Sequence, residues 1–221
     1  MSPGHAELAH AVVRLGRRMS SAGLVLGAGG NISARTGVDE ILVTPSGRAL
    51  EELDPADLVS LGLDGEVRRG TAAPTSESAM HLAAHRARPD MVVAIHAHPP
   101  HANLLAASGH DIRLITLDHA YYVRRLAVVP YLPSGSSELA DAVSDRLTDV
   151  DVVMLTHHGC LLVAPDGEAG FERVSNLEAA ATATYRALLL GDTTTVCPPE
   201  YLERIERREA AARADAAEGG G

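Results

Sequence analysis

Aromatic side chains are scarce in this sequence. They make up only 3% of its 221 residues, with one Phe and no Trp. Because 46% of the residues are nevertheless hydrophobic, the core must be built from Ala, Leu and Val. The length predicts one domain over residues 1–221 that buries a sizeable core, with a mobile tail from about residue 200.

Cysteine is also rare, and long basic runs and long apolar runs are missing. The two cysteines, Cys160 and Cys197, lack a paired metal spacing and predict no disulfide framework. A net charge of −10 without a long basic run argues against nucleic acid or an anionic membrane as a partner. No apolar run approaches the roughly 20 residues that span a bilayer, and the first residues lack a signal-peptide pattern. We therefore expect a cytoplasmic protein.

Hydrophobic periodicity predicts helices mixed with short strands. Helices are expected over residues 7–20, 75–86, 99–107, 137–147, 168–190 and after 199. Strands are expected over residues 31–35, 40–44, 57–63, 66–69, 92–98, 126–129 and 151–157, the last continuing to 164 past a glycine kink. Thr75 or Ser76 is expected to cap the second helix. The mixture predicts an α/β fold around a mainly antiparallel or mixed sheet.

Two histidines follow one of the apolar strands. Five apolar residues lead into His96-Ala97-His98, and two prolines then end the pattern. Side chains alternate along a strand, so His96 and His98 face the same way, with Cα atoms roughly 6.5 Å apart. This spacing suits two imidazoles that bind one metal ion, although two exposed histidines at a strand end would look the same.

A second apolar strand ends in His157-His158-Gly159. Neighbouring residues of a strand face opposite sides, so only one of these two histidines can readily join His96 and His98. Three protein ligands leave one position open, which is the pattern of a catalytic rather than a structural metal site.

Glu77 stands at the start of a predicted helix, beside Thr75 and Ser76. A carboxylate near a divalent metal can be a ligand or a general base, and donors at a helix N-terminus can bind phosphate. Taken alone, Glu77 is better explained as an exposed glutamate favoured by the helix dipole. His81 lies four residues further on; such a histidine more often packs or forms a hydrogen bond, and we leave it out of the site.

Five motifs together resemble the class II aldolase/adducin family, in the family's order and spacing, from about residue 6 to residue 190. The motifs are Gly29-Gly30-Asn31-Ile32-Ser33, Thr44-Pro45-Ser46-Gly47, Pro74-Thr75-Ser76-Glu77, His96-Ala97-His98-Pro99 and His157-His158-Gly159. The resemblance implies a three-layer α/β/α fold and a homotetramer with active sites at subunit interfaces.

The resemblance also implies the roles of the site residues. His96, His98 and His158 would bind Zn²⁺, with Mn²⁺ or Co²⁺ as alternatives, and His157 would be structural. Glu77 would move the substrate proton. The phosphate pocket would consist of Gly30, Asn31, Ser46, Gly47, Thr75 and Ser76. The implied reaction is the reversible cleavage of a (deoxy)ketose 1-phosphate, such as L-fuculose 1-phosphate, to dihydroxyacetone phosphate and an aldehyde.

The sequence departs from the family's aldolases at two tyrosines. No tyrosine occupies the matching place in the segment 115–122, where Tyr121 or Tyr122 either substitutes or packs in the interior. No clear counterpart of the C-terminal tyrosine lies between residues 204 and 221. The alternative functions are a decarboxylase of a keto-acid sugar phosphate, which the Tyr121-Tyr122-Val123 run resembles, and an adducin-like interaction domain. The family's epimerases carry Asp in place of Glu77, and adducin-like heads lose the metal histidines.

Overall fold

The computed structural model describes residues 3–218, with the backbone alone for residue 3 and residues 209–218. The helices are α1 Pro3–Ser21, α2 Ser78–Ala87, α3 Pro100–Ala107, α4 Leu117–Val123, α5 Ser137–Leu147, α6 Gly167–Leu189 and α7 Pro199–Glu218, with short 3-10 turns at Leu50–Glu52 and Pro55–Asp57. The strands are β1 Asn31–Arg35, β2 Glu40–Val43, β3 Val59–Gly62, β4 Val67–Arg69, β5 Val93–Ala97, β6 Leu126–Val129, β7 Val152–Leu155 and β8 Gly159–Ala164.

All eight strands form one sheet in the order β4-β3-β2-β1-β5-β8-β7-β6. Neighbouring strands are antiparallel except β6 and β7, which are parallel. The predicted mainly antiparallel, mixed sheet is therefore confirmed. Strand β1 pairs with β5, about sixty residues away in the sequence, and β5 also pairs with β8.

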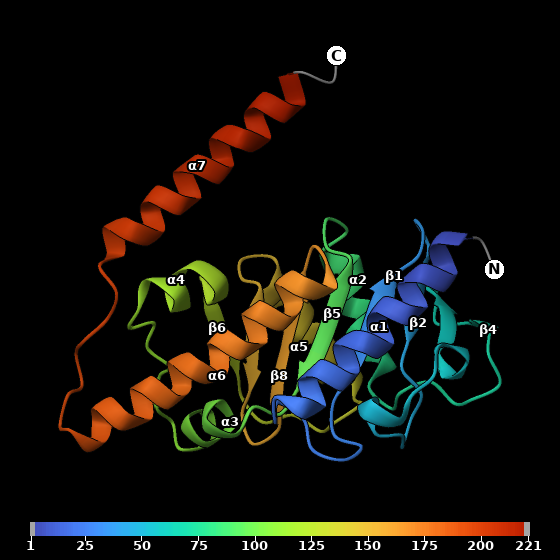
Figure 1. Cartoon of the computed structure of the whole chain (residues 1–221), viewed down its shortest axis with the longest axis horizontal. Helices are drawn as coiled ribbons and strands as arrows, with labels where there is room; N and C mark the ends of the chain where they lie inside the picture. The colour runs from blue at the N-terminus through green and yellow to red at the C-terminus, as the bar shows by residue number, and fades with distance from the viewer. Residues whose placement is uncertain (1–2, 219–221) are drawn as a thin grey trace.

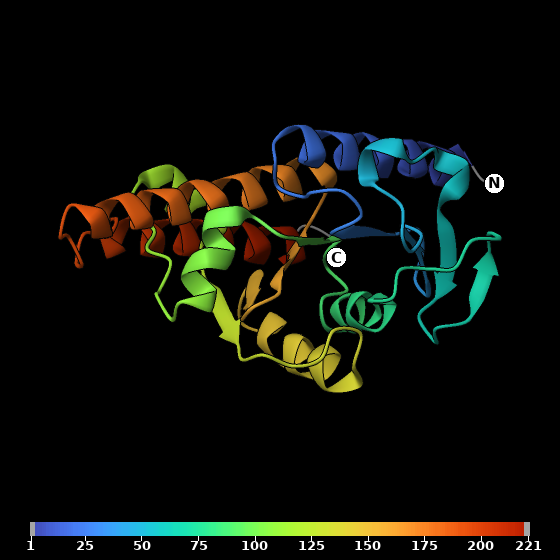
Figure 2. The same ribbon diagram turned by 90° about the horizontal axis from the view of Figure 1, so that it is seen from below.

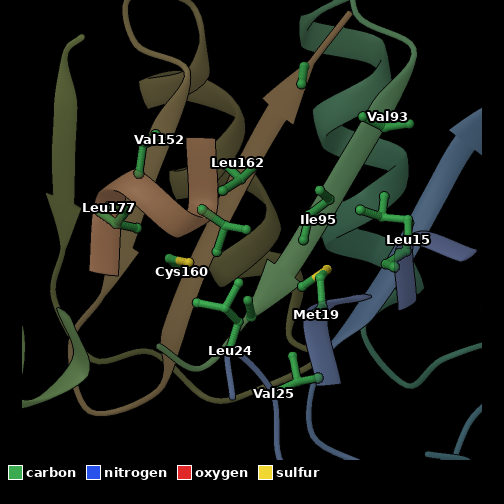
Figure 3. Close-up of a cluster of buried hydrophobic side chains, with 14 of the residues drawn as sticks. Leu15, Met19, Leu24, Val25, Val93, Ile95, Val152, Cys160, Leu162 and Leu177 are labelled. Carbon is green, nitrogen blue, oxygen red and sulfur yellow. The ribbon is translucent and has the colours of Figure 1, made fainter. Parts of the chain in front are cut away.

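Helices cover both faces of this sheet (Figures 1 and 2). Helices α1, α3 and α6 pack on one face, and α2 and α5 pack on the other. Side chains alternate between the faces, so Ile95 belongs to the first cluster and Ala94 to the second. Figure 3 shows the first cluster, where Leu15 and Met19 of α1 lie near Ile95. This three-layer α/β/α arrangement confirms the predicted fold, with an aliphatic core.

The prediction of one strand bending past Gly159 was wrong. Strands β7 and β8 are antiparallel partners, paired from Val152↔Leu162 to Leu155↔Gly159. The chain reverses between them, and His157 takes a φ of 63° in the turn. His157 and His158 therefore do not face opposite sides of a strand; they lie in a tight hairpin connection.

Two smaller differences concern helices. The predicted cap of α2 was wrong, because the N-cap residue is Glu77, and the Thr75 Oγ1 instead accepts the Glu77 backbone N–H at 3.3 Å. Helix α4 was not predicted.

Helix α7 leads away from the layers in Figure 1, although its Glu206 forms an ion pair with Arg125 at 2.8 Å. Within residues 3–218, no helix combines the length and apolar character needed to cross a membrane.

Candidate metal centre

Three imidazoles converge where β5 ends and β8 begins. His96 lies in β5, His98 follows it, and His158 precedes β8 in the hairpin turn. The pairing of Ala97 with Cys160 holds these two segments side by side. As a result, one ligand atom from each of the three histidines lies within 4.8 Å of the others. The structure thus brings together the three residues predicted as metal ligands.

A hydrogen bond fixes the direction of the buried His96 ring. Its Nδ1–H donates to the backbone carbonyl of Cys160 at 2.9 Å. The lone pair of Nε2 therefore points at the Nε2 of His98 and at Oε2 of Glu77, each 2.9 Å away. Lone pairs this close repel unless a cation lies among them. A backbone carbonyl that orients a metal-binding imidazole is common in metal sites, so the donor set fits a divalent metal.

Glu77 lies against this histidine cluster and is only 4% exposed. Its Oε1 is 3.0 Å from Nε2 of His158 and accepts a hydrogen bond from the hydroxyl of Ser134 at 2.8 Å. Its Oε2 accepts from the amide of Asn31 at 3.2 Å. Burial opposes ionisation of Glu77, but its close contacts with His158 and His96 and the hydrogen bond from Ser134 outweigh it and hold its pKa below the usual range. Glu77 is thus an ionised carboxylate, and the alternative of an exposed helix-start glutamate is wrong.

The surroundings keep His98 uncharged and hold the hairpin turn of His158 in place. Burial, and then the charges of His96 and His158, lower the pKa of His98 to about 4. Neutral imidazole is the form that binds a metal. The amide of Asn103 in α3 donates to the backbone carbonyl of His158 at 3.3 Å and anchors the hairpin turn.

Glycines allow this close packing. A Cβ atom on Gly159 would lie 2.5 Å from the carbonyl oxygen of Ala97 and 2.5 Å from the His98 ring. Gly30 has a φ of +92°, and a Cβ atom there would lie 2.6 Å from a methyl group of Val25. Both positions therefore need glycine for steric reasons.

The segments predicted to bind phosphate lie next to one another. The backbone N–H of Ser46 donates to the carbonyl oxygen of Ala73 at 3.0 Å, and the backbone N–H of Thr75 donates to the carbonyl oxygen of Thr44 at 3.1 Å. The backbone N–H of Thr44 also donates to the carbonyl oxygen of Ile32, and the Thr44 hydroxyl oxygen accepts from the Ile32 N–H. These two bonds place the turn next to Gly30 and Asn31. Three of the predicted residues are exposed on this surface, namely Ser46, Gly47 and Ser76.

The two tyrosines proposed as substitutes do not reach the histidines of the same chain. Tyr121 and Tyr122 belong to α4, which ends just before β6. Strand β6 runs parallel to β7, with Leu126 opposite Val152, whereas the histidine turn follows the other end of β7. Tyr121 is 44% exposed, so the interpretation of a buried packing residue is wrong for it.

Ser134, which contacts Glu77, was not predicted from the sequence. Ser134 donates to Glu77 from the loop before α5, and its neighbour Gly135 has a φ of +75°. A Cβ atom on Gly135 would lie 2.9 Å from the carbonyl oxygen of Ser76, so this loop sits against the start of α2. The Pro133-Ser134-Gly135 sequence predicts a turn, but it does not indicate that Ser134 contacts Glu77.

Comparison with known proteins defines the family. The family model described as "Class II Aldolase and Adducin N-terminal domain" matches residues 10–185. The "5-deoxy-D-ribulose 1-phosphate aldolase" of Bacillus thuringiensis serovar kurstaki is 31% identical over 89% of this chain and 92% of its own length. The "L-fuculose phosphate aldolase" of Methanocaldococcus jannaschii is 33% identical over 80% of this chain and 96% of its own length.

A solved structure and a third relative complete the comparison. The structure "L-fuculose 1-phosphate aldolase" superposes with a TM-score of 0.83 at 26% identity, over 90% of this chain and 96% of that one. The "3-oxo-tetronate 4-phosphate decarboxylase" of Haemophilus influenzae is 27% identical over 77% of this chain and 83% of its own length. The chain belongs to the class II aldolase and adducin family. The prediction of a lyase of this family is confirmed.

Proposed function

We propose that the protein is a metal-dependent aldolase that reversibly cleaves a (deoxy)ketose 1-phosphate to dihydroxyacetone phosphate and an aldehyde. The observation that carries this proposal is the convergence of three imidazoles and one ionised carboxylate on a single point. L-Fuculose 1-phosphate and 5-deoxyribulose 1-phosphate are the substrates we expect, since relatives are named for each.

The histidines would hold the metal in this proposal. His96, His98 and His158 would bind Zn²⁺, and the same nitrogen donors also accept Mn²⁺ or Co²⁺. The bound cation would supply Lewis-acid stabilisation of negative charge on the substrate oxygens. His157, in the hairpin turn, would have a structural role.

Glu77 would transfer the proton. In the synthetic direction, its ionised carboxylate removes a proton from the carbon of dihydroxyacetone phosphate that forms the new bond. In the cleavage direction, the carboxyl group returns that proton to the same carbon after the C3–C4 bond breaks. Burial of Glu77 keeps bulk water away from this exchange.

The exposed turns beside the site would bind the substrate phosphate. Backbone and hydroxyl donors of Ser46, Gly47, Thr75 and Ser76, with the loop at Gly30 and Asn31, are the groups we assign to it. Such donors bind phosphate even in an acidic protein. We also propose a homotetramer, for which light scattering should give a mass near four times the 23.1 kDa of one chain.

One experiment tests the function. The purified protein is analysed for bound metal per chain and is offered L-fuculose 1-phosphate, ribulose 1-phosphate and 5-deoxyribulose 1-phosphate, with release of dihydroxyacetone phosphate as the readout. About one zinc per chain together with product release is the expected result. A chain that binds no metal would contradict the proposal and favour an adducin-like interaction domain.

A decarboxylase is the second candidate, because one relative is named for that reaction. Both reactions leave negative charge on a carbon next to a carbonyl group, so the same metal and carboxylate could serve either. Bound zinc with carbon dioxide release from 3-oxo-tetronate 4-phosphate, and no cleavage of the ketose 1-phosphates, would establish the decarboxylase instead.

A further inference from the structure

A chain of buried polar side chains runs from Glu77 into the layer between β1 and α2. Residues 31 and 33 of β1 face the helix, and residues 77, 81 and 85 follow at helical spacing on the facing side of α2. The members of this relay, as we call it, are Glu77, Asn31, His81, Ser33 and His85. None of them is more than 8% exposed.

Four hydrogen bonds connect the relay from one end to the other. The amide nitrogen of Asn31 donates to Glu77 at 3.2 Å, and its oxygen lies 2.6 Å from Nε2 of His81. The hydroxyl of Ser33 lies 2.7 Å from Nδ1 of His81 and 2.9 Å from Nε2 of His85.

The orientation of the Asn31 amide fixes the direction of all four bonds. Its NH₂ group donates to Oε2 of Glu77 and its oxygen faces Nε2 of His81, and an amide oxygen only accepts hydrogen bonds. His81 then donates from Nε2 and accepts the Ser33 proton at Nδ1, and His85 donates to Ser33. The reverse order would set the oxygen of Asn31 against Oε2 of Glu77, two acceptors in contact.

The relay orients groups and does not conduct protons. Burial is the main cause that lowers the pKa of both His81 and His85, to about 3, so both rings are neutral. A primary amide does not take up and release protons near neutral pH, so Asn31 interrupts any proton path to Glu77.

We propose that His81, supported by Ser33 and His85, is a positioning residue that locks the Asn31 amide so that it holds the Glu77 carboxylate in place for proton transfer. This inference rests on the proposed function of Glu77. Without the His81 donor, the Asn31 amide can rotate and present its oxygen to Glu77, which displaces the carboxylate. Groups that orient a catalytic residue typically change rates by about 10- to 100-fold.

The experiment compares four variants with the metal-loaded wild type. His81→Phe removes both hydrogen bonds at similar volume, and His81→Gln keeps an amide N–H near the place of Nε2. Ser33→Ala removes the hydroxyl. Leu82→Ala is the matched control, because Leu82 is the next residue of α2 but packs in a separate apolar cluster with Ile41 and Leu61.

We expect His81→Phe to lower kcat about 10- to 100-fold with KM within about threefold of wild type and bound metal unchanged. His81→Gln should recover part of the loss, and Ser33→Ala should lie between His81→Phe and the wild type. Leu82→Ala should lower the melting temperature but keep kcat. If His81→Phe does not fold, the Gln and Ser33→Ala variants carry the comparison.

A crystal structure of the metal-loaded His81→Phe variant gives a readout besides activity. We expect a rotated Asn31 amide and a displaced Glu77 carboxylate, with the three metal histidines unmoved. Wild-type kcat in His81→Phe, or an equal loss in Leu82→Ala, would overturn the proposal. If the wild type cleaves no ketose 1-phosphate, the proposed function fails, and the crystal structure alone decides whether His81 orients the carboxylate.

Discussion

At the scale of single residues, the two oxygens of the Glu77 carboxylate have different partners. Ser134 and His158 contact one oxygen, and Asn31 and His96 contact the other. Glu77→Gln keeps this shape but can neither remove nor return a proton. We predict that the variant retains its metal and that kcat falls about 10²- to 10⁴-fold. Metal analysis and steady-state kinetics check this, and wild-type turnover would exclude Glu77 as the acid/base.

His96→Ala removes a metal ligand. This variant should therefore lose the metal in addition to its turnover.

His85 makes stability depend on pH. Burial, followed by the charges of His81 and Arg35, lowers its pKa from 6.5 to about 3. The unfolded chain therefore takes up a proton below pH 6.5, whereas the folded chain does so only near pH 3, and stability falls as the pH falls between these values. At one pKa unit per 1.36 kcal/mol, the loss from His85 is about 2 kcal/mol at pH 5.

The variant His85→Gln isolates this effect, because glutamine keeps an amide N–H donor but does not titrate. Urea unfolding at pH 7 and pH 5 should show that the wild type loses about 2 kcal/mol more stability than the variant. The other titrating groups are common to both proteins, so their contributions cancel in the comparison. An identical pH dependence in the two proteins would show that His85 is not held neutral in the fold.

At the scale of elements, the sequence indicates the site better than it indicates the connections. The His96-x-His98 spacing at a strand end predicted two of the ligands directly. The hairpin between β7 and β8 escaped prediction because its turn has no Gly, Pro or Asn before Gly159, and continuous apolar residues on both sides suit one long strand or two short ones. Helix α4 has seven residues, too few to show a helical period.

Gly159 tests the packing between β5 and β8. Gly159→Ala would place a methyl group 2.5 Å from both the Ala97 carbonyl and the His98 ring. We predict a loss of about 1–3 kcal/mol of stability and at least about tenfold weaker zinc binding, because the strands must separate and His98 must turn. Gly37→Ala is the control, since a Cβ atom there meets nothing within 4 Å. Competition titration with a zinc chelator measures the zinc affinity of both variants. Equal zinc affinity in the two variants would contradict the steric argument.

At the scale of the whole molecule, long-range pairing assembles what the sequence separates. Asn31 lies opposite His96 in the sheet and bonds to His81, fifty residues away. Sequence spacing predicts which residues share a face of one element, but strand order depends on the total packing of both layers. For this reason His81 looked like an ordinary packed histidine in the sequence, although the regular spacing of Glu77, His81 and His85 was already visible.

Metal removal should destabilise the molecule as a whole, because the ligands join the end of β5 to the β7–β8 hairpin at the centre of the sheet. A metal present at about 100 times its Kd adds about 2.7 kcal/mol to the folded state. For a chain of this length, that corresponds to a fall of about 5–10 °C in Tm when a chelator removes it. Thermal unfolding before and after chelation, with metal content measured on the same samples, checks the prediction. His96→Ala should show no metal-dependent shift, and a wild-type Tm that stays constant after complete metal loss would mean that the histidine cluster is stable by packing alone.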